Sequence, residues 1–290
     1  MKASFEGKGI TEDQRRLLIL RAAELSARGE NSAVASSFLT PAEQRTVFEA
    51  QKGSGGCDRL FLWGGYSGAT RRKAVFLPLW AVPDGDIPDR YEPFSEEREN
   101  YFVRTLTEYG QEDILRDFIC PLRLLSGGYT PINHRDWLGA LMALGLKRNV
   151  IGDIVKSSEP EGTYLFCDVK SADFIKSELT RAGRDAVTCE DVPEGEKIVP
   201  VKDFEKISFT AASPRADAVV RSLCALSREK AAEIILSGLV ELNYFPLSDT
   251  TKHISPGDVI SVRGYGKFVI DSTDGTTKKG RTRIEVRKYK

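Results

Sequence analysis

Two segments near the N-terminus repeat apolar residues at the spacing of an α-helix. The first spans residues 11–29, with Thr11 as its cap, and its apolar side is formed by Leu17, Leu18, Leu20, Ala22 and Leu25. The second begins in FLTPAEQ, where Thr40 as N-cap, Pro41 at the first helical position and Glu43 form a capping box. The glycine-rich QKGSGGC, residues 51–57, interrupts the pattern. We therefore predict a helical N-terminal region over residues 1–55.

Residues 56–209 alternate between short apolar runs and amphipathic helical patterns. The predicted strands are RLFLW, KAVFLPLW, FICPLRLL and GTYLFCDVK, and we expect those with Pro78 and Pro121 at sheet edges or strand ends. The predicted helices are SEERENYFVRTLTEY, HRDWLGALMALG and SADFIKSELTRAG, the last closed by Gly183. This alternation predicts a small open sheet covered by helices.

The C-terminal segment, residues 210–290, predicts two short helices followed by strands. Ser213 and Pro214 are expected to start the first helix, while Ser227 caps the second and Gly238 ends it. LVELN and ISPGDVISVRGYGKFVI then have strand and turn patterns. In the last strand the apolar face consists of Thr282, Ile284 and Val286, and the other face of Arg281, Arg283, Glu285 and Arg287.

The charge of the chain is balanced overall but not along its length. All 290 residues together carry 42 basic and 42 acidic side chains, whereas the segment from Ala211 onward carries fourteen Lys and Arg against nine Asp and Glu. Most of this surplus lies in KKGRTRIEVRKYK, residues 278–290. A basic end of this kind is typical of a protein with a polyanionic partner, and a solvated tail is the alternative.

Several classes of protein do not fit this sequence. The chain has no apolar run long enough to span a bilayer and no export signal at its start, which predicts a cytoplasmic protein without a membrane partner. Its five scattered cysteines lack a CxxC spacing and are accompanied by only two histidines, so we expect reduced thiols and no metal. GGYSG and SGGYT lack the spacing of nucleotide-binding loops, and we predict no cofactor.

The second C-terminal helix begins with cations where the helix dipole disfavours them. Arg228 and Lys230 follow Ser227 directly, and an anion bound at the free N–H groups of this helix start would explain them. The alternative is a pair of solvated side chains. Asp217 is interpreted as a helix-start residue or as a partner that orients an arginine. The predicted RNA-binding residues are Arg215, Arg221, Ser227, Arg228, Lys230, Lys278, Lys279, Arg281 and Arg283.

The spaced elements of this C-terminal segment resemble the S4 domain, the αL RNA-binding motif. The matching positions are Arg215 and Asp217, Ser227-Arg228, Gly238, Val240 to Asn243, and Gly257-Asp258-Val259-Ile260, with Ala216 where the motif usually has Leu. WGGYSGATRRK, HRDWLGALMALGLKRNVIGDIV and VRGYGKF further resemble the bacterial YlmH family of ribosome-associated S4 proteins. Thr70 stands where a Glu is expected, which puts any role of a carboxylate there in doubt.

The resemblance implies an α+β fold with a helical N-terminal region (1–55), an RRM-like central domain (56–209) and an S4 domain (210–290). It also implies a function: binding ribosomal RNA and tRNA on obstructed large subunits that carry peptidyl-tRNA, and supporting nascent-chain tailing in ribosome-associated quality control. We expect a monomer without catalytic residues.

NHRDWLGALMALG allows two interpretations. In the first, Asn133 caps a helix, and His134, Arg135, Lys147 and Arg148 form a second RNA-contact patch. In the second, Asp136 is the catalytic aspartate of an RNA-modifying enzyme such as a pseudouridine synthase. Those enzymes carry this aspartate in an H-R-L-D segment, which His134-Arg135-Asp136 resembles with one residue missing. Tyr66 and Tyr129 are candidates either for base stacking on an RRM-like sheet or for burial at its edge.

Overall fold

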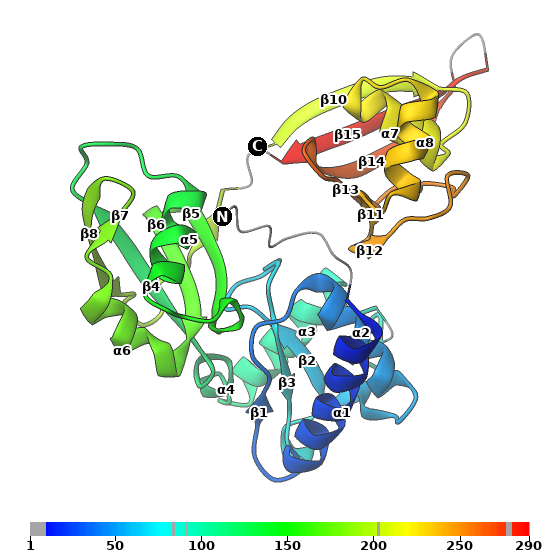
Figure 1. Cartoon of the computed structure of the whole chain (residues 1–290). Coiled ribbons are helices and arrows are strands. Elements are labelled where there is room, and N and C mark those ends of the chain that lie inside the picture. Colours follow the sequence, from blue (N-terminus) through cyan, green and yellow to red (C-terminus); the bar gives the residue numbers. More distant parts are fainter. Residues whose placement is uncertain (1–9, 83–84, 91, 202–203, 277–279, 290) are drawn as a thin grey trace. The chain divides into compact units, whose positions relative to one another are not determined.

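The computed structural model describes residues 10–82, 85–90, 92–201, 204–276 and 280–289, with the side chains of 274–276 not described. The chain divides into two compact units. One covers Glu12–Val201 and the other includes Lys202–Lys290 (Figure 1).

The first part of the Glu12–Val201 unit packs helices against a three-stranded antiparallel sheet of order β1-β3-β2. Its elements are α1 (Glu12–Arg28), β1 (Val34–Ala35), α2 (Pro41–Lys52), η1 (Gly56–Asp58), β2 (Leu60–Trp63), β3 (Lys73–Phe76), η2 (Leu79–Ala81), α3 (Glu96–Glu108) and α4 (Asp113–Arg116). The predicted capping box is confirmed, because Thr40 and Glu43 each accept from the other's backbone N–H.

Packing in this part crosses the boundary that the sequence predicts at 55/56. β1 pairs with β3, and the fully buried Phe48 of α2 lies in one core with Leu60 and Phe76 of the strands. A two-residue strand and two helices bury too little surface to be stable alone, so residues 12–52 share their core with β2 and β3.

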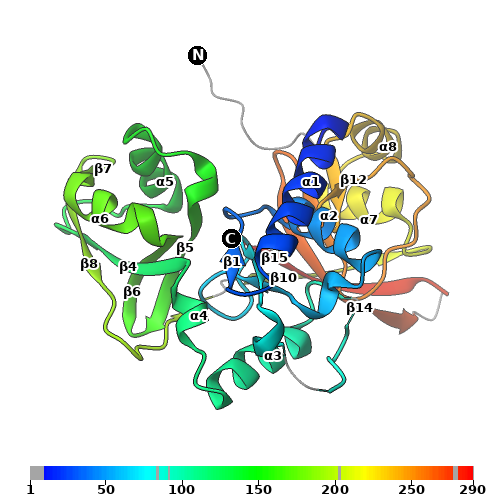
Figure 2. The ribbon, with the colours of Figure 1, turned by 90° about the horizontal axis from the view of Figure 1, so that it is seen from below.

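The second part of this unit is an antiparallel sheet of order β7-β8-β4-β6-β5-β9, here called the central sheet. Its elements are β4 (Ile119–Ser126), α5 (His134–Ala143), η3 (Arg148–Val150), β5 (Ile151–Glu159), β6 (Glu161–Asp168), α6 (Val169–Glu178), β7 (Arg181–Ala182), β8 (Asp185–Asp191) and β9 (Val199–Pro200). The succession β4-α5-β5-β6-α6-β8 with spatial order β8-β4-β6-β5 is the split βαβ arrangement of RRM domains. Figure 2 shows α5 and α6 on the same side of the strands.

The side chains on the two faces of the central sheet belong to two different hydrophobic cores. Leu122 and Leu165 pack against Trp137 of α5 and Ile175 of α6. Side chains of the opposite face pack against β2, β3 and α3 in a core that includes Phe61, Phe102, Tyr164 and Phe166. Strands β4 and β6 are therefore covered on both sides, which explains their nearly continuous apolar sequences.

Two details of the central sheet differ from the sequence predictions. β4 is an interior strand although it contains Pro121; its pairing with β8 begins only at Leu122, so at the proline the strand has a neighbour on one side only. The helix that Gly183 was expected to close ends already at Glu178, because Arg181 and Ala182 pair with β8 and Gly183 forms their turn with a φ of 59°.

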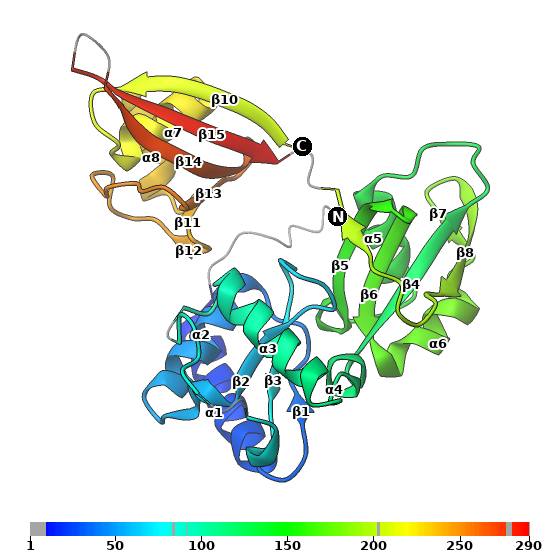
Figure 3. The same ribbon diagram turned by 180° about the vertical axis from the view of Figure 1, so that it is seen from behind.

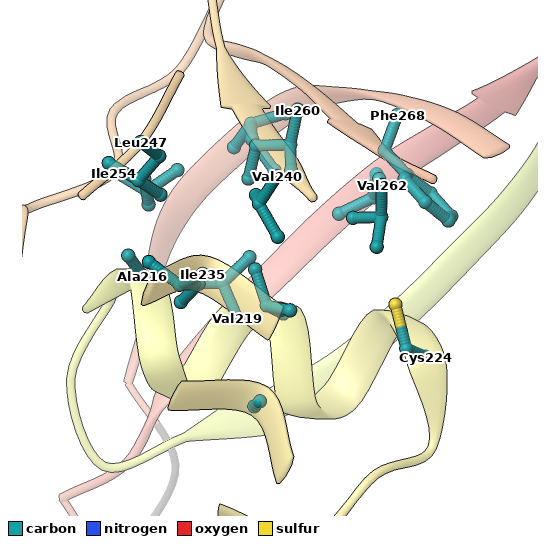
Figure 4. Close-up of a cluster of buried hydrophobic side chains, with 14 of the residues drawn as sticks. Ala216, Val219, Cys224, Ile235, Val240, Leu247, Ile254, Ile260, Val262 and Phe268 are labelled. Carbon is teal, nitrogen blue, oxygen red and sulfur yellow. The ribbon is translucent and has the colours of Figure 1, made fainter. Parts of the chain in front are cut away.

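The C-terminal unit is a six-stranded antiparallel sheet, of order β10-β15-β14-β13-β11-β12, covered by two helices. Its elements are β10 (Phe204–Ala211), α7 (Ala216–Cys224), α8 (Arg228–Leu236), β11 (Val240–Leu242), β12 (Phe245–Pro246), β13 (Val259–Val262), β14 (Gly266–Thr276) and β15 (Thr282–Tyr289). Figures 1 and 3 show α7 and α8 together on one face of the sheet. Between the layers, Val219 and Ile235 of the helices point toward Val240, Ile260 and Val262 of the strands (Figure 4).

The predicted alternation of the last strand is confirmed. Ile284 and Val286 are buried under the helices, while Arg283 and Glu285 are exposed on the outer face. β10 pairs with β15 along its whole length, from Phe204 opposite Tyr289 to Ala211 opposite Thr282. The C-terminal unit therefore starts before the predicted boundary at 210. That boundary assigns most of β10 to the preceding segment.

All five cysteines are free thiols, and three of them, Cys57, Cys167 and Cys224, are buried. None of the helices in the described ranges is long and apolar enough to cross a bilayer.

Candidate nucleic-acid interface

Helix α7 starts two residues later than the sequence predicts. Arg215, rather than Ser213, is its N-cap and has an extended backbone that forms a bridge with His253. The N–H groups of Ala216 and Asp217 donate to the carbonyls of Lys252 and Thr250, each at 2.9 Å. These first-turn N–H groups are therefore satisfied by the protein itself and are not open to an anion.

Asp217 holds two arginines that come from different helix starts. Its Oδ1 and Oδ2 accept from Nε and Nη2 of Arg215 at 3.1 Å, and Oδ2 also accepts from Nε and Nη2 of Arg228 at 3.3 Å. The carboxylate is buried, but the side chains of Arg215 and Arg228 are 39% and 71% exposed. The interpretation of Asp217 as an orienting partner is confirmed, and we call this arrangement the arginine clamp.

The protonation of Asp217 suits this role. Burial alone raises the pKa of this carboxyl, but the hydrogen bonds from Arg215, from the N–H of Ala218 and from Arg228 outweigh it, so the pKa lies below its usual value. The carboxylate stays ionised at neutral pH and fixes two guanidinium groups that still present donors to solvent.

The start of α8 combines a cap with donors that face solvent. Ser227 Oγ accepts from the N–H of Lys230 at 3.2 Å, which confirms Ser227 as N-cap. Within the described part of the chain, the N–H groups of Arg228 and Glu229 have no acceptor. Lys230 Nζ pairs with Glu233 at 2.7 Å and its side chain is half exposed. Arg228 is therefore the better candidate for binding an anion at this helix start.

The remaining predicted residues of the C-terminal unit do not form one continuous surface with the clamp. Arg221 is exposed on α7. Arg283 points outward from β15, on the sheet face opposite the helices, and Arg281 Nη2 donates to the carbonyl of Thr210 at 2.8 Å. Lys278 and Lys279 lie outside the described residues.

Two S4-type positions outside the clamp shape the strand end beside it. Asn243 has a φ of 50°, and its side chain donates to Asp258 Oδ1 at 2.7 Å and accepts from the N–H of Val259 at 2.9 Å. Asp258 also accepts from the N–H of Ser255 at 2.7 Å. These contacts hold two turns together and give Asn243 and Asp258 a structural task at this spacing.

The second predicted patch is only partly available for RNA. His134, Arg135 and Lys147 are exposed, whereas Arg148 Nη1 donates to the carbonyls of Ile151 at 2.6 Å and Gly152 at 3.2 Å. Arg148 therefore fastens the start of β5.

Asp136 has a structural task at the same helix start. Its Oδ2 accepts from the N–H of Asn133 at 3.2 Å, and Asn133 Oδ1 accepts from the N–H of Arg135 and of Asp136. This reciprocal capping box matches the first of the two interpretations of NHRDW.

The sheet face on which RRM domains stack bases is filled by this chain. Tyr164 and Phe166 of β6 are 0% and 1% exposed, and the ring of Phe166 packs against that of Tyr66 in a tilted arrangement with centroids 4.8 Å apart. Tyr66 is buried and donates to Asp153 Oδ2 at 2.8 Å; burial, together with this carboxylate, raises its pKa. Of the two candidate tyrosines only Tyr129 is accessible, at 87% exposed.

The WGGYSGATRRK segment turns out to be a structural connector. Asp153 accepts from the N–H of Thr70 at 2.6 Å, and Arg71 Nε donates to the carbonyl of Ile151 at 3.0 Å. Arg72 pairs with the buried Glu99 at 3.0 Å. The side chain of Thr70, where the family resemblance leads us to expect a Glu, is exposed. Asp153 and Glu99 were not identified from the sequence because their partners lie far away along the chain.

Two sequence comparisons point to one family. The family model described as "Putative RNA-binding domain in YlmH" matches residues 126–196. The "Ribosome-associated protein quality control protein P2" of Bacillus subtilis (strain 168) is 30% identical over 255 residues, covering 88% of this chain and 87% of the relative. A solved structure, "Cell division protein ylmH from Streptococcus pneumoniae", matches 65% of this chain and 96% of its own at 15% identity and a TM-score of 0.41.

The match to the Bacillus subtilis relative covers 88% of this chain, and the family model falls on the RRM-like part of the central sheet. This chain belongs to the YlmH family.

Proposed function

We propose that this chain is a non-catalytic RNA-binding protein that associates with the ribosome. The observation that carries the proposal is the arginine clamp, in which a buried carboxylate holds two exposed guanidinium groups beside a helix start with free N–H groups. Such a surface suits phosphate groups, because guanidinium forks and helix N-termini both bind phosphate oxygens. The name of the Bacillus subtilis relative supports association with ribosomes.

The finer proposal concerns the state of the ribosome. We infer that the chain binds ribosomal RNA and tRNA on obstructed large subunits carrying peptidyl-tRNA, and supports nascent-chain tailing in quality control. The relative's printed role in ribosome-associated quality control supports this assignment. Folded RNA is recognised mainly through phosphates and 2′-hydroxyls matched in shape, which requires fixed cations rather than base-reading side chains.

Arg215 and Arg228 are the proposed primary phosphate contacts. Their geometry is fixed by Asp217, so little side-chain entropy is lost when an RNA phosphate binds. Lys230 extends this surface, whereas Arg221 on α7 and Arg281 and Arg283 on the β15 side are proposed as separate contacts.

The proposal of a non-catalytic role rests on how Asp136 is used. Its carboxylate accepts from the backbone N–H of Asn133 at its own helix start, so it is already engaged in a structural contact. A modifying enzyme would therefore need another residue, or would need this cap to open.

The test is co-sedimentation of the tagged full-length chain with large ribosomal subunits at low and high salt. We compare wild type with Arg215→Ala/Arg228→Ala and with Arg228→Ala alone, which leaves Arg215 bonded to Asp217. Arg16→Ala, a change at an exposed arginine of α1, is the matched control. Loss of co-sedimentation in both clamp variants but not in the control supports the proposal, whereas unchanged co-sedimentation of the clamp variants contradicts it.

A further inference from the structure

The RRM-like domain needs a different RNA-contact surface if it binds RNA at all. RRM domains stack bases on aromatic side chains of the open sheet face. In this chain Tyr164 and Phe166 are buried against the preceding part of the same unit, and Arg123 donates to the Tyr164 hydroxyl at 2.7 Å. No base can stack there while the unit is folded, so an RNA contact of this domain must use another surface, and the exposed end of the central sheet offers one.

We propose that this end, built from loop 127–133, the start of α5 and the β7–β8 turn, binds an unpaired RNA base and its flanking phosphates. Tyr129 provides the stacking surface, and Arg135, Arg181 and Arg184 provide the phosphate contacts. This inference rests on the proposed RNA-binding function. All four residues lie within 126–196, the range matched by the family model.

The three segments are fastened to one another. The N–H of Gly127 donates to the carbonyl of Ala186 at 3.0 Å, and the N–H of Thr130 donates to Asp185 Oδ2 at 3.1 Å. On the other side, a Cβ at Gly183 would lie 3.6 Å from Cγ of Asp136, at the start of α5. The loop that carries Tyr129 is thus held between the β7–β8 turn and α5.

Tyr129 is placed for contact with a partner. Its ring is 87% exposed and lies beside Gly127, where an added Cβ would be 3.4 Å from the ring. An aromatic side chain this exposed gains almost nothing from hydrophobic burial within the protein. Its flat face is available for a base, and base–aromatic stacking tolerates any base identity.

The charges around Tyr129 favour an anionic ligand. Arg135, Arg181 and Arg184 are exposed, and none of these three has an ion-pair partner in the described ranges. The carboxylates of the same region are engaged by the backbone: Asp185 is 2% exposed and accepts from Thr130, and Asp136 accepts from Asn133. The surface therefore presents its cations and keeps its carboxylates in local hydrogen bonds.

An unpaired base fits this combination better than a duplex. A single exposed ring can stack only on a base that has left its own helix, whereas arginines alone would suit any phosphate backbone. The chemistry thus indicates a single-stranded loop, bulge or end.

The experiment measures binding of the full-length chain to a labelled oligouridylate of about twelve nucleotides, which has no internal structure, by fluorescence anisotropy. Tyr129→Ala is expected to weaken binding about five- to 150-fold, while Tyr129→Phe stays close to wild type. Arg135→Ala/Arg184→Ala is expected to lower the salt slope by about 1.4. Tyr109→Ala, at a half-exposed tyrosine of the same unit, is the matched control.

Two outcomes overturn the inference. One is unchanged affinity of Tyr129→Ala. The other is a wild-type chain that sediments with large subunits but does not bind the oligouridylate, which would indicate a protein or duplex partner for this surface. Failure of the proposed function is recognised separately, as unchanged sedimentation of the Arg228 variants with large subunits. Those variants leave Tyr129 intact.

Discussion

Asp217 and Arg228 are eleven residues apart in sequence, yet Oδ2 of the first accepts from Nε and Nη2 of the second at 3.3 Å. The contact joins the starts of α7 and α8 and holds the exposed side chain of Arg228 in one orientation. A cation at the start of a helix is disfavoured by the dipole, and Asp217 offsets that cost.

Arg228→Ala should reduce the salt dependence of RNA binding. Each lost phosphate contact lowers the slope of log affinity against log salt by about 0.7–0.9, and we expect a change of that size. Arg228→Lys should keep the slope but bind more weakly, because an ammonium lacks the fork that contacts carboxylate and phosphate together. Titrations of a structured ribosomal RNA fragment at several salt concentrations measure both, and an unaltered slope in Arg228→Ala would exclude this contact.

Asp217→Asn should weaken RNA binding and lower stability by about 1–3 kcal/mol, because the amide carries no negative charge and its NH2 group cannot accept the hydrogen bonds that Arg215 and Arg228 donate to the carboxylate. The wild-type pKa is depressed in the folded state, so the stabilisation is complete above the unfolded pKa of about 3.9 and is lost as pH falls through the folded pKa. Denaturant unfolding between neutral pH and about pH 3 should show the difference between the two proteins shrinking on acidification. A difference that is constant with pH would contradict this origin.

Asn243→Ala should destabilise the C-terminal unit more than Asn243→Gly. Both changes remove the hydrogen bonds to Asp258 and Val259, but glycine adopts the φ of 50° without strain whereas alanine adopts it only at a conformational cost. We expect a difference of about 1 kcal/mol between the two variants in thermal or denaturant unfolding. Equal stabilities would mean that the backbone relaxes at this position.

Gly65→Ala should destabilise the Glu12–Val201 unit strongly. Gly65 has a φ of 96°, and an added Cβ would come within 2.4 Å of Cδ1 of Phe166. Gly55→Ala is the matched control, since Gly55 has a φ of 72° but open space around it. We expect about 1 kcal/mol for the control and a further 1–3 kcal/mol or so for Gly65→Ala. Similar losses in both variants would show that the contact with Phe166 adapts easily.

Local signals in the sequence predicted the elements well. The capping box at Thr40, the caps at Asn133 and Ser227 and the alternation of β15 were all readable, because each depends on residues within one or two turns of each other. Errors occurred where pairing partners are distant. β10 was placed with the wrong segment because its partner β15 lies far away along the chain, and α6 was extended through Arg181, where pairing with β8 overrides the local helical pattern.

The residues of the candidate site likewise fall into those that local sequence patterns identify and those whose roles depend on the tertiary structure. The sequence by itself identified Arg215, Arg228 and Ser227, because a basic helix start and the spacing of an S4 domain are local patterns. Only the tertiary structure decided that Asp217 binds both arginines, that Arg148 and Tyr66 serve packing, and that Tyr129 stays exposed. The physical reason is that a side chain's partners and exposure depend on which segments the fold brings beside it, and that information is not contained in its sequence neighbours.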